Sequence, residues 1–438
     1  MSKIQIDFQK TVGPIKPMHA VNGGPTKALK DRAGAGNFQQ WAEAGIPYAR
    51  NHDVSYVGGF GGEHIVDVWS IFKDKNADVN DPASYDFALT DHFLENLQLA
   101  GTKVFYRLGN KIEHWVKKYG TLPPPDFQKW AEICEHIIRH YTEGWADGFC
   151  WDIDYWEIWN EPELDPDDSP NKRTWGGTTA QFYDLYEIAA KHLKTCFPHL
   201  KIGGPALAGH EDWAEDFLNE MKKRNVPIDF FSWHIYTVEP KELTQRTERI
   251  QKILQRTGYE QAENHCNEWN FVRSWEDNFI EAPQTIISMK GAAFIAGCML
   301  ASQPTCLDLL MYYYVQPGSF NGVFDYYTYR PLKGYYVFKM FNQLYRLGTS
   351  CQVTCNEDGI YAVAAKDQNG KSAVMVCYYT DESEKPAKKT LSLELLSGAA
   401  EYQLYLLDDQ HSAEPTATVS CTDTVTLQPN TVILLESK

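Results

Sequence analysis

The chain has 438 residues, of which 43 % are hydrophobic and 23 % are charged, and its formal net charge is −17. This composition is typical of a globular protein with room for one large domain and a smaller one. A strongly acidic chain repels nucleic acid and anionic membranes, so neither is an expected partner and a neutral substrate is expected instead.

The cysteines and the apolar runs indicate in which cellular compartment the protein is expected. The amino terminus lacks the apolar core of a signal peptide. The longest apolar run, Met289 to Ala301, contains Lys290 and is too short to cross a bilayer. The ten cysteines form no C-x-x-C pair, which argues against a zinc site. We therefore expect reduced thiols, no metal or other cofactor, and a cytoplasmic protein.

Strand-like and helical patterns alternate along most of the chain. Eight strands are predicted near residues 17, 48, 105, 157, 202, 231, 266 and 310. Most are followed by a helical pattern, at 37–44, 86–100, 127–145, 179–197, 213–224, 240–256, 285–301 and 335–346. Eight such units predict a closed (β/α)8 barrel of parallel strands over residues 13–347. An open doubly wound sheet is the alternative, but no phosphate-loop fingerprint supports it.

The pattern changes after Gly348. Runs with strand periodicity at 360–365, 372–379, 390–395, 400–407 and 424–435, separated by turns such as Asn369-Gly370, predict a β-sandwich over residues 348–438. The first residues also alternate, with Ile4, Ile6 and Phe8 on one side. A lone strand at 1–12 has no place in the barrel, so we expect it to pair with the sandwich.

The first candidate catalytic residues lie at the end of the fourth predicted strand. Asp154 to Asp165 reads D-Y-W-E-I-W-N-E-P-E-L-D, and its first half alternates as a strand does. Pro162 ends the strand because it has no N–H to donate. Asn160 and Glu161 therefore stand at a carboxyl strand end, where barrels of parallel strands place their chemistry.

A second carboxylate also lies at the end of a predicted barrel strand. The stretch Asn264 to Asn270 reads N-H-C-N-E-W-N and puts Glu268 at the end of the seventh strand. The ends of the fourth and seventh strands face each other across the mouth of an eight-stranded barrel. The sixth strand ends in His234 and Tyr236. The second strand supplies His52 and Asp53 beside the same mouth.

Two facing carboxylates are what cleavage of a glycosidic bond needs. One carboxylic acid protonates the leaving oxygen, and one carboxylate attacks the anomeric carbon or activates water. We assign Glu161 as general acid and base and Glu268 as nucleophile. Tyr236 or His234 can donate a hydrogen bond that keeps Glu268 ionised. Asn160 is expected to hold a sugar hydroxyl next to the anomeric carbon.

These motifs resemble those of retaining glycoside hydrolases of the (β/α)8 clan. The N-E-P at 160–162, the S-W-H-I-Y at 232–236 and the N-E-W-N at 267–270 are most similar to family 39, which includes β-xylosidases and α-L-iduronidases. The resemblance spans most of the chain. It implies the same roles for Glu161 and Glu268, and a sugar site lined by Asn160, His234, Tyr236 and His52. His52 corresponds to the R-x-H of the family, here at residues 50–52.

Other residues are weaker candidates for contact with the sugar. Trp269 is either a sugar platform or barrel packing, and Asp53 is equally open. His19 and Asn110 are expected to be structural more often than functional. The family's xylosidases carry acidic residues after the last strand, where this chain has Tyr312 to Tyr314, with Asp325 the nearest acid. This departure leaves the identity of the sugar open.

Several alternatives stand beside the main interpretation. The favoured function is a retaining hydrolase, exo-acting on a neutral β-linked plant-type glycoside such as a xyloside, because the loops after the second and eighth strands are long enough to block one end of the cleft. The others are an endo-acting glycanase, an exo-enzyme for an arabinoside, galactoside or glucoside, a barrel that only binds carbohydrate, and a metal hydrolase using His52, Asp53, His234 and Glu268. The expected partner is an oligosaccharide or glycoside, and a homo-oligomer is possible.

Overall fold

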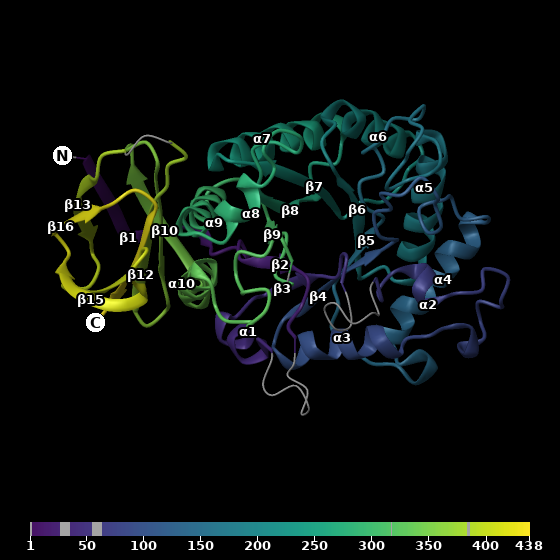
Figure 1. Ribbon diagram of the computed structural model, residues 1–438, viewed down its shortest axis with the longest axis horizontal. Helices are drawn as coiled ribbons and strands as arrows, with labels where there is room; N and C mark the ends of the chain where they lie inside the picture. The colour runs from purple at the N-terminus through teal and green to yellow at the C-terminus, as the bar shows by residue number, and fades with distance from the viewer. Residues whose placement is uncertain (1, 27–35, 55–63, 317, 383–385) are drawn as a thin grey trace.

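The first part of the chain folds into a closed barrel of eight parallel strands. The computed structural model describes residues 2–26, 36–54, 64–316, 318–382 and 386–438 (Figure 1). The barrel strands follow in chain order, and β9 pairs back with β2 to close the ring. Their bounds are β2 Ala20–Asn22, β3 Tyr48–Arg50, β4 Lys103–Leu108, β5 Tyr155–Ile158, β6 Lys201–Leu207, β7 Phe230–Thr237, β8 Glu263–Phe271 and β9 Leu309–Tyr312. The predicted barrel is confirmed.

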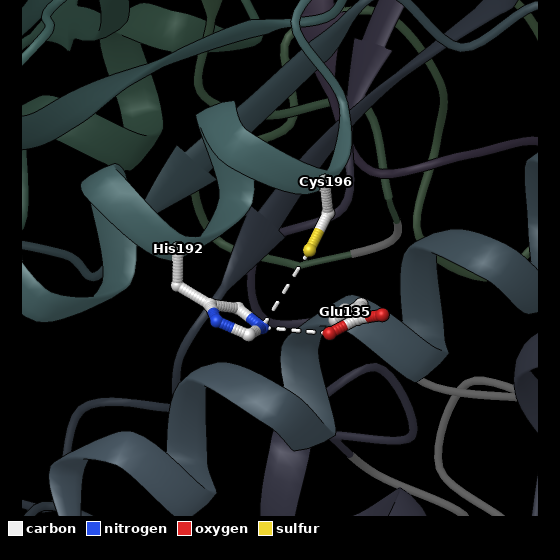
Figure 2. Close-up of side chains that lie close together, drawn as sticks. All are labelled: Glu135, His192 and Cys196. Atoms are coloured by element: carbon white, nitrogen blue, oxygen red, sulfur yellow. Dashed lines mark hydrogen bonds and ion pairs between the residues drawn. The ribbon is translucent and has the colours of Figure 1, made fainter.

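Helices between the strands form the outer layer of the barrel (Figure 1). Their bounds are α1 Phe38–Ala44, α2 Val68–Ile71, α3 Ala88–Leu99, α4 Phe127–Thr142, α5 Thr179–Cys196, α6 Glu211–Lys223, α7 Pro240–Thr257, α8 Glu281–Ile286, α9 Met289–Ser302 and α10 Lys333–Leu347, with short 3-10 turns at Pro82–Ser84 and Trp145–Asp147. The long helices bury one apolar stripe against the strands, as the periodicity predicts. Helices α4 and α5 are neighbours in this layer, and a hydrogen bond between Glu135 and His192 joins them (Figure 2).

The first barrel strand begins later than predicted. The sequence places it from Lys16, but β2 starts only at Ala20, because the backbone turns after Pro17 and the Met18 amide bonds to the Lys16 carbonyl at 2.8 Å. His19 therefore lies at the amino end of the strand and not at the carboxyl end. Because of this shift, the structure places His19 outside the candidate site described below.

The carboxyl-terminal part forms a nine-stranded mixed sheet. Its strands are β1 Ser2–Pro14, β10 Thr349–Cys355, β11 Ile360–Lys366, β12 Ser372–Tyr378, β13 Lys389–Leu396, β14 Glu401–Leu407, β15 Ser412–Ser420, β16 Thr424–Leu427 and β17 Thr431–Ser437. Strand β1 lies inside the sheet, antiparallel to β10 and parallel to β13. The predicted pairing of the amino-terminal strand with the tail is confirmed. Strands β10 and β15 were not predicted.

The two faces of this sheet serve different cores. Along β12, Val374 and Val376 join an apolar cluster enclosed by the sheet itself, which also takes in residues from β15 and β16 at its two ends. The sheet thus folds over its own core as a β-sandwich does. Met375 and Cys377, on the other face, belong to the large core of the barrel. They face α9, which has twelve of its 14 residues buried.

No helix in the described ranges is both long enough and apolar enough to cross a membrane.

Candidate active site

Glu161 stands on a strained turn directly after β5. Trp159 has a φ of 72° and Glu161 a φ of 48°, a region that non-glycine residues rarely occupy. Both amides are held by neighbouring strands: that of Trp159 donates to the Leu108 carbonyl at 2.7 Å, and that of Glu161 donates to the Ala206 carbonyl at 3.0 Å. Such strain persists only where the surroundings enforce it, and it gathers at functional sites.

Glu268 owes its direction to a bulge in β8. The register between β7 and β8 slips by one residue between Trp233 and His234, which leaves Asn267 as the extra residue. Both Asn267 and Glu268 consequently point inside the barrel. The Glu268 carboxylate accepts a hydrogen bond from the Tyr236 hydroxyl at 2.5 Å. The sequence allowed either Tyr236 or His234 to make this contact with Glu268.

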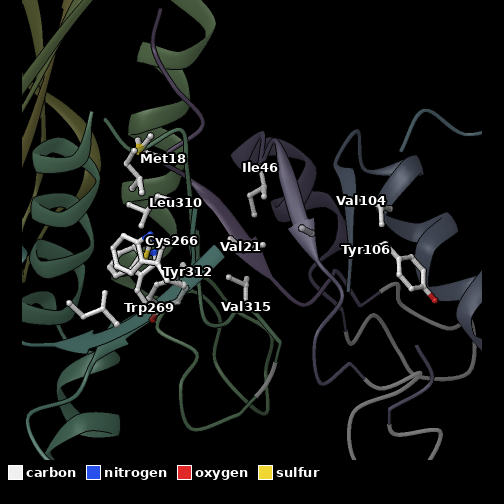
Figure 3. Close-up of a cluster of buried hydrophobic side chains, with 14 of the residues drawn as sticks. Met18, Val21, Ile46, Val104, Tyr106, Cys266, Trp269, Leu310, Tyr312 and Val315 are labelled. Atoms are coloured by element: carbon white, nitrogen blue, oxygen red, sulfur yellow. The ribbon is translucent and has the colours of Figure 1, made fainter. Parts of the chain in front are cut away.

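The same bulge turns Trp269 away from the mouth. Trp269 is buried and packs against Phe294 of α9 and Tyr312 of β9, with ring centroids 5.9 and 5.3 Å apart (Figure 3). The structure therefore places the Trp269 ring in the packing between the barrel and α9.

The two glutamates meet at His234. Its Nδ1 lies 2.8 Å from an oxygen of Glu161 and 3.7 Å from an oxygen of Glu268. One oxygen of each glutamate and a nitrogen of His234 all lie within 4.8 Å of one another. The residues predicted from the fourth, sixth and seventh strands are thus brought together in one group at the carboxyl ends of the strands.

A buried ion pair supports this group from below. Arg50 and Glu157 are both fully buried, and Arg50 Nε donates to Glu157 at 2.7 Å. The same guanidinium lies 3.3 Å from an oxygen of Glu268 and donates to the Oδ1 of Asn160 at 2.6 Å. Because Asn160 accepts through Oδ1, its Nδ2 group remains as a donor. Arg50 therefore fixes both the nucleophile candidate and the amide beside Glu161.

The sequence did not single out Arg50 or Glu157 as site residues. The signal was present in each case: Arg50 is part of the R-x-H motif, and Glu157 is a charged residue on a strand otherwise made of aromatic and apolar residues. A charge inside a barrel needs a partner, because removing an ion from water costs several kcal/mol. Arg50 and Glu157 neutralise each other in this way.

His52 and Asp53 lie beside the glutamates at the end of β3. Asp53 accepts a hydrogen bond from the Tyr313 hydroxyl at 3.4 Å and lies 3.2 Å from the Nε2 of His52. Within the described part of the chain, the Nδ1 of His52, the Oδ1 of Asp53 and the Nε2 of His234 are buried polar atoms without a hydrogen-bond partner, although the Oδ1 of Asp53 lies 3.7 Å from the Nδ1 of His64. Buried polar groups are usually satisfied, so these atoms are available to a polar ligand.

Burial sets the protonation of the group. Burial raises the pKa of Glu161 to about 7, against the opposing effect of Arg50. Burial also raises the pKa of Glu268, and His234, Arg50 and Tyr236 oppose that shift. Burial lowers the pKa of His234 to about 4, so its ring is neutral at pH 7. Glu161 can therefore hold a proton near neutral pH, as a general acid must.

Of the predicted site residues, His19 is not brought to this group. His19 is buried between Phe341 and Tyr345 of α10, with ring centroids 5.2 and 4.9 Å away, because it precedes β2. Asn110 lies on the loop after β4 and packs against Gly120. Among the described residues, no hydrogen bond joins Asn110 to Glu161 or Glu268. His19 is thus a core residue of the helical layer.

The residues at the end of β9 are tyrosines, where the family's xylosidases carry acidic residues. Tyr313 is half-buried near His52, at a centroid distance of 6.2 Å, while Tyr312 faces the opposite way toward α10. Asp325 caps a surface turn through the amides of residues 327 and 328. The loop after β3, which was expected to help block the cleft, falls partly on residues 55–63, outside the described residues.

An exposed tryptophan stands at the rim of the site. Trp275, on the loop after β8, is 55 % exposed, and its ring lies 4.8 Å from that of Tyr236. Phe320 supports it at 6.0 Å. Nothing in the sequence connected Trp275 with the site, because its contact with Tyr236 depends on the path of a loop.

The group formed by Glu161, His234 and Glu268 contains atoms that can ligate a cation, but a positively charged arginine already lies beside it. Glu161, His234 and Glu268 each offer one ligand atom. Arg50 holds a positive charge 3.3 Å from Glu268, and Tyr236 occupies another of its oxygens. These partners favour the charged form of Glu268, so the arrangement suits proton transfer and attack by a carboxylate.

Comparison with known proteins identifies a family whose sequence model matches this chain. Residues 2–419 match the model described as glycosyl hydrolases family 39. A beta-xylosidase from Geobacillus stearothermophilus is 24 % identical over 258 residues, which are 52 % of this chain and 47 % of that protein. The chain thus spans about half the length of this curated relative.

Solved structures share the fold over the whole chain. A glucosidase from Croceicoccus marinus superposes with a TM-score of 0.80 at 22 % identity, covering 100 % of this chain and 98 % of that chain. A monomeric beta-xylosidase from Caulobacter crescentus CB15 superposes with a TM-score of 0.71 at 17 % identity, covering 100 % and 99 %. At these identities the likeness concerns the fold.

Proposed function

The chain belongs to glycosyl hydrolases family 39, and we propose that it is a retaining, exo-acting glycoside hydrolase for a neutral β-linked plant-type glycoside, with a β-xyloside as first candidate. The observation that carries the proposal is the approach of Glu161 and Glu268, each with an oxygen within 4.8 Å of the other's. Retaining enzymes hold their carboxyl groups about 5–5.5 Å apart, against about 6.5–9.5 Å in inverting ones.

In the first step, Glu161 acts as an acid. Its proton passes to the glycosidic oxygen while the bond between that oxygen and the anomeric carbon breaks. The Glu268 carboxylate forms a bond to the same carbon and yields a covalent glycosyl-enzyme. Tyr236 and Arg50 orient the attacking carboxylate through their contacts with its oxygens. The Nδ2 of Asn160 donates to the hydroxyl next to the anomeric carbon.

In the second step, the roles reverse. Glu161, now a carboxylate, takes a proton from water, and the water oxygen attacks the anomeric carbon and releases Glu268. Formation of the ester removes the negative charge of Glu268, which repels a charge on Glu161. The pKa of Glu161 therefore falls in the intermediate, and this favours its use as a base.

The choice of sugar rests on the named relatives and on the wall of the site. The curated relative is a beta-xylosidase, whereas a structural neighbour is titled a glucosidase. Tyr313 stands where an acid would grip a sugar hydroxyl, so Asp53 and His52 remain as the polar groups on that side. Arabinosides, galactosides and glucosides stay in the panel of candidates, and an endo-acting glycanase is the second candidate function.

The remaining expectations stay proposals of the same kind. The partner is a glycoside or oligosaccharide, without nucleic acid. All ten cysteines are free thiols, which supports work in a reducing compartment such as the cytoplasm.

The test is hydrolysis of 4-nitrophenyl glycosides of xylose, arabinose, galactose and glucose, with the anomer of the first product followed by NMR. We expect turnover of one β-glycoside with retention. Glu268→Ala should abolish turnover while the fold survives, and Glu161→Ala should be partly rescued by azide. Inversion, or full activity of both variants, would refute the assignment. Tight binding without turnover of any glycoside would identify a binding protein.

A further inference from the structure

The outer helices α4 and α5 carry three ligating side chains that the catalytic site does not use. Glu135 comes from α4, whereas His192 and Cys196 lie one turn apart on α5. Residues four positions apart on a helix share one face, and this face is turned toward α4. Figure 2 shows the three side chains pointing toward one another. One ligand atom of each lies within 4.8 Å of the other two.

The distances are close to those of a metal site. His192 Nε2 lies 2.7 Å from a Glu135 oxygen and 3.8 Å from the sulfur of Cys196. In a tetrahedral zinc site, bonds of about 2.0–2.3 Å set the nitrogen about 3.4 Å from the oxygen and about 3.6 Å from the sulfur. The first gap must therefore open by about 0.7 Å and the second close by about 0.2 Å, within reach of small side-chain rotations.

Other side chains already hold the ligands in place. Arg139 Nε donates to the other oxygen of Glu135 at 2.7 Å, and the side-chain amide of Gln128 lies 3.2 Å from the Nδ1 of His192. An amide can turn its oxygen toward a protonated Nδ1. Outer hydrogen bonds of this kind orient the ligands of metal sites. The side chains of Glu135 and His192 are 14 % and 19 % exposed, so an ion can enter from solvent.

We propose that Glu135, His192 and Cys196 bind one soft divalent cation of the zinc type, separate from the catalytic site, with solvent as the fourth ligand. A thiolate, an imidazole and a carboxylate suit zinc, and the thiolate disfavours magnesium and calcium. Binding displaces the hydrogen bond between Glu135 and His192 and releases the thiol proton of Cys196. The cation clamps α4 to α5, the helix that follows the strand leading to Glu161.

This site departs from the expectation of no metal. That expectation rested on the absence of C-x-x-C pairs, but the present ligands come from two helices and are 57 residues apart in the case of Glu135 and His192. Sequence spacing cannot detect such a site, because only the packing of α4 on α5 brings the ligands together.

The test is titration of the reduced, chelator-free protein with Zn²⁺ and with Co²⁺. We expect one equivalent of Zn²⁺ to bind, a higher melting temperature, and a thiolate-to-cobalt charge-transfer band. His192→Ala, Cys196→Ser and the nearly isosteric Glu135→Gln should weaken binding by more than about tenfold, the loss that even outer partners can cause. The cobalt band should vanish in Cys196→Ser.

Two controls separate this site from others. Cys150→Ala removes an exposed thiol elsewhere and should leave binding unchanged. Glu268→Gln disables the proposed hydrolysis yet should keep the cobalt band, so a failure of either proposal is visible without the other. The proposal is overturned if the protein binds no Zn²⁺, or if the three ligand variants bind it as tightly as the unaltered chain.

Discussion

Glu161 and Glu268 carry the same side chain, but the proposed mechanism requires them to start in opposite protonation states. Glu268 is buried and the side chain of Glu161 is 13 % exposed, and burial raises the pKa of both. The difference lies in their partners. Glu268 faces the Arg50 guanidinium and the Tyr236 hydroxyl, which favour its charged form, whereas Glu161 faces the neutral ring of His234. These partners support the proposed roles of Glu268 as nucleophile and Glu161 as acid.

The pKa of Glu161 predicts an alkaline limit to the activity. Glu161 must be protonated in the first step, and its pKa is raised to about 7, so kcat/KM should fall as the pH rises through about 7. Glu161→Gln should remove this limb when the substrate has a good leaving group. Glu163→Gln is the matched control, because burial also raises the pKa of Glu163 to about 7. The limb should survive in that control, with a small shift at most.

Tyr236 is predicted to position the nucleophile. Tyr236→Phe removes the 2.5 Å hydrogen bond to Glu268. Hydrogen bonds to charged groups contribute about 1.5–3 kcal/mol, so kcat/KM should fall by about 10- to 150-fold. Steady-state kinetics measure the loss, and Tyr327→Phe, at an 84 % exposed position, should have no effect. An unchanged kcat/KM in Tyr236→Phe would contradict the role.

The residues that sequence reasoning placed correctly are those at strand ends, and the misplaced ones show why direction is harder to predict. The carboxyl ends of β5, β7 and β8 could be read from where their patterns stop. The direction of each side chain could not, because a slip of one residue turns every following side chain to the other face. Trp269 lies just past such a slip, and His19 depends on where β2 begins.

At the scale of elements, the strand ends are tied together by one buried ion pair. Arg50 of β3 and Glu157 of β5 link strands that are not neighbours in the ring, and Asn267 of β8 donates to Glu157 at 2.5 Å. The mouth therefore keeps its shape through charges inside the barrel as well as through the strand hydrogen bonds.

Breaking this pair should destabilise the barrel. Glu157→Gln leaves the Arg50 charge buried with its main partner gone, and such changes cost about 3–5 kcal/mol. Chemical denaturation should show this loss in the free energy of unfolding, together with reduced kcat. Glu215→Gln, which breaks an ion pair of Arg256 at the surface, should change stability by less than about 1 kcal/mol. Equal stability of the two variants would refute a supporting role for Glu157.

The loop after β8 is predicted to bind part of the substrate through Trp275. Ring contacts contribute about 0.5–1.5 kcal/mol, so Trp275→Ala should lower kcat/KM by about two- to tenfold, chiefly through a higher KM. The matched control is Trp115→Ala, a tryptophan that is 72 % exposed. Kinetics on an oligosaccharide and on an aryl glycoside test the prediction, and an unchanged KM on both would contradict it.

At the scale of the whole molecule, the first strand ties the two ends of the chain together. Strand β1 lies between β10 and β13, and Ile4, Ile6 and Phe8 enter the core that the sheet encloses. The barrel follows β1 directly and packs α9 and α10 against the other face of the sheet. The sheet therefore depends on residues that precede the barrel.

Truncating a core residue of β1 should weaken the sheet without touching the chemistry. Ile6 is fully buried, so Ile6→Ala should cost about 2–5 kcal/mol. Val12→Ala, at a position 62 % exposed on the same strand, should cost less than about 0.5 kcal/mol. Thermal denaturation measures both, and kcat per folded molecule should stay unchanged. A stability loss that is equal in the two variants would contradict this account.

The overall architecture could be predicted because strands and helices alternate with clear periods over some 300 residues. The tail was predicted less completely. Strand β15 contains Pro415 and is mostly exposed, and β10 begins directly after α10, where only Cys351, Val353 and Cys355 alternate with polar residues, so both strands were missed. The pairing of β1 with the tail was predictable because an apolar alternating segment needs a sheet to join, and the barrel was already complete.

The central claim is a covalent bond between the sugar and Glu268. The most direct measurement is mass spectrometry of the protein, intact and after proteolysis, following incubation with a 2-deoxy-2-fluoro glycoside that carries a good leaving group. We expect one sugar per chain, attached to the peptide that contains Glu268, and no label in Glu268→Ala. A label on another residue, or turnover of the parent glycoside without any trapped sugar, would contradict the account.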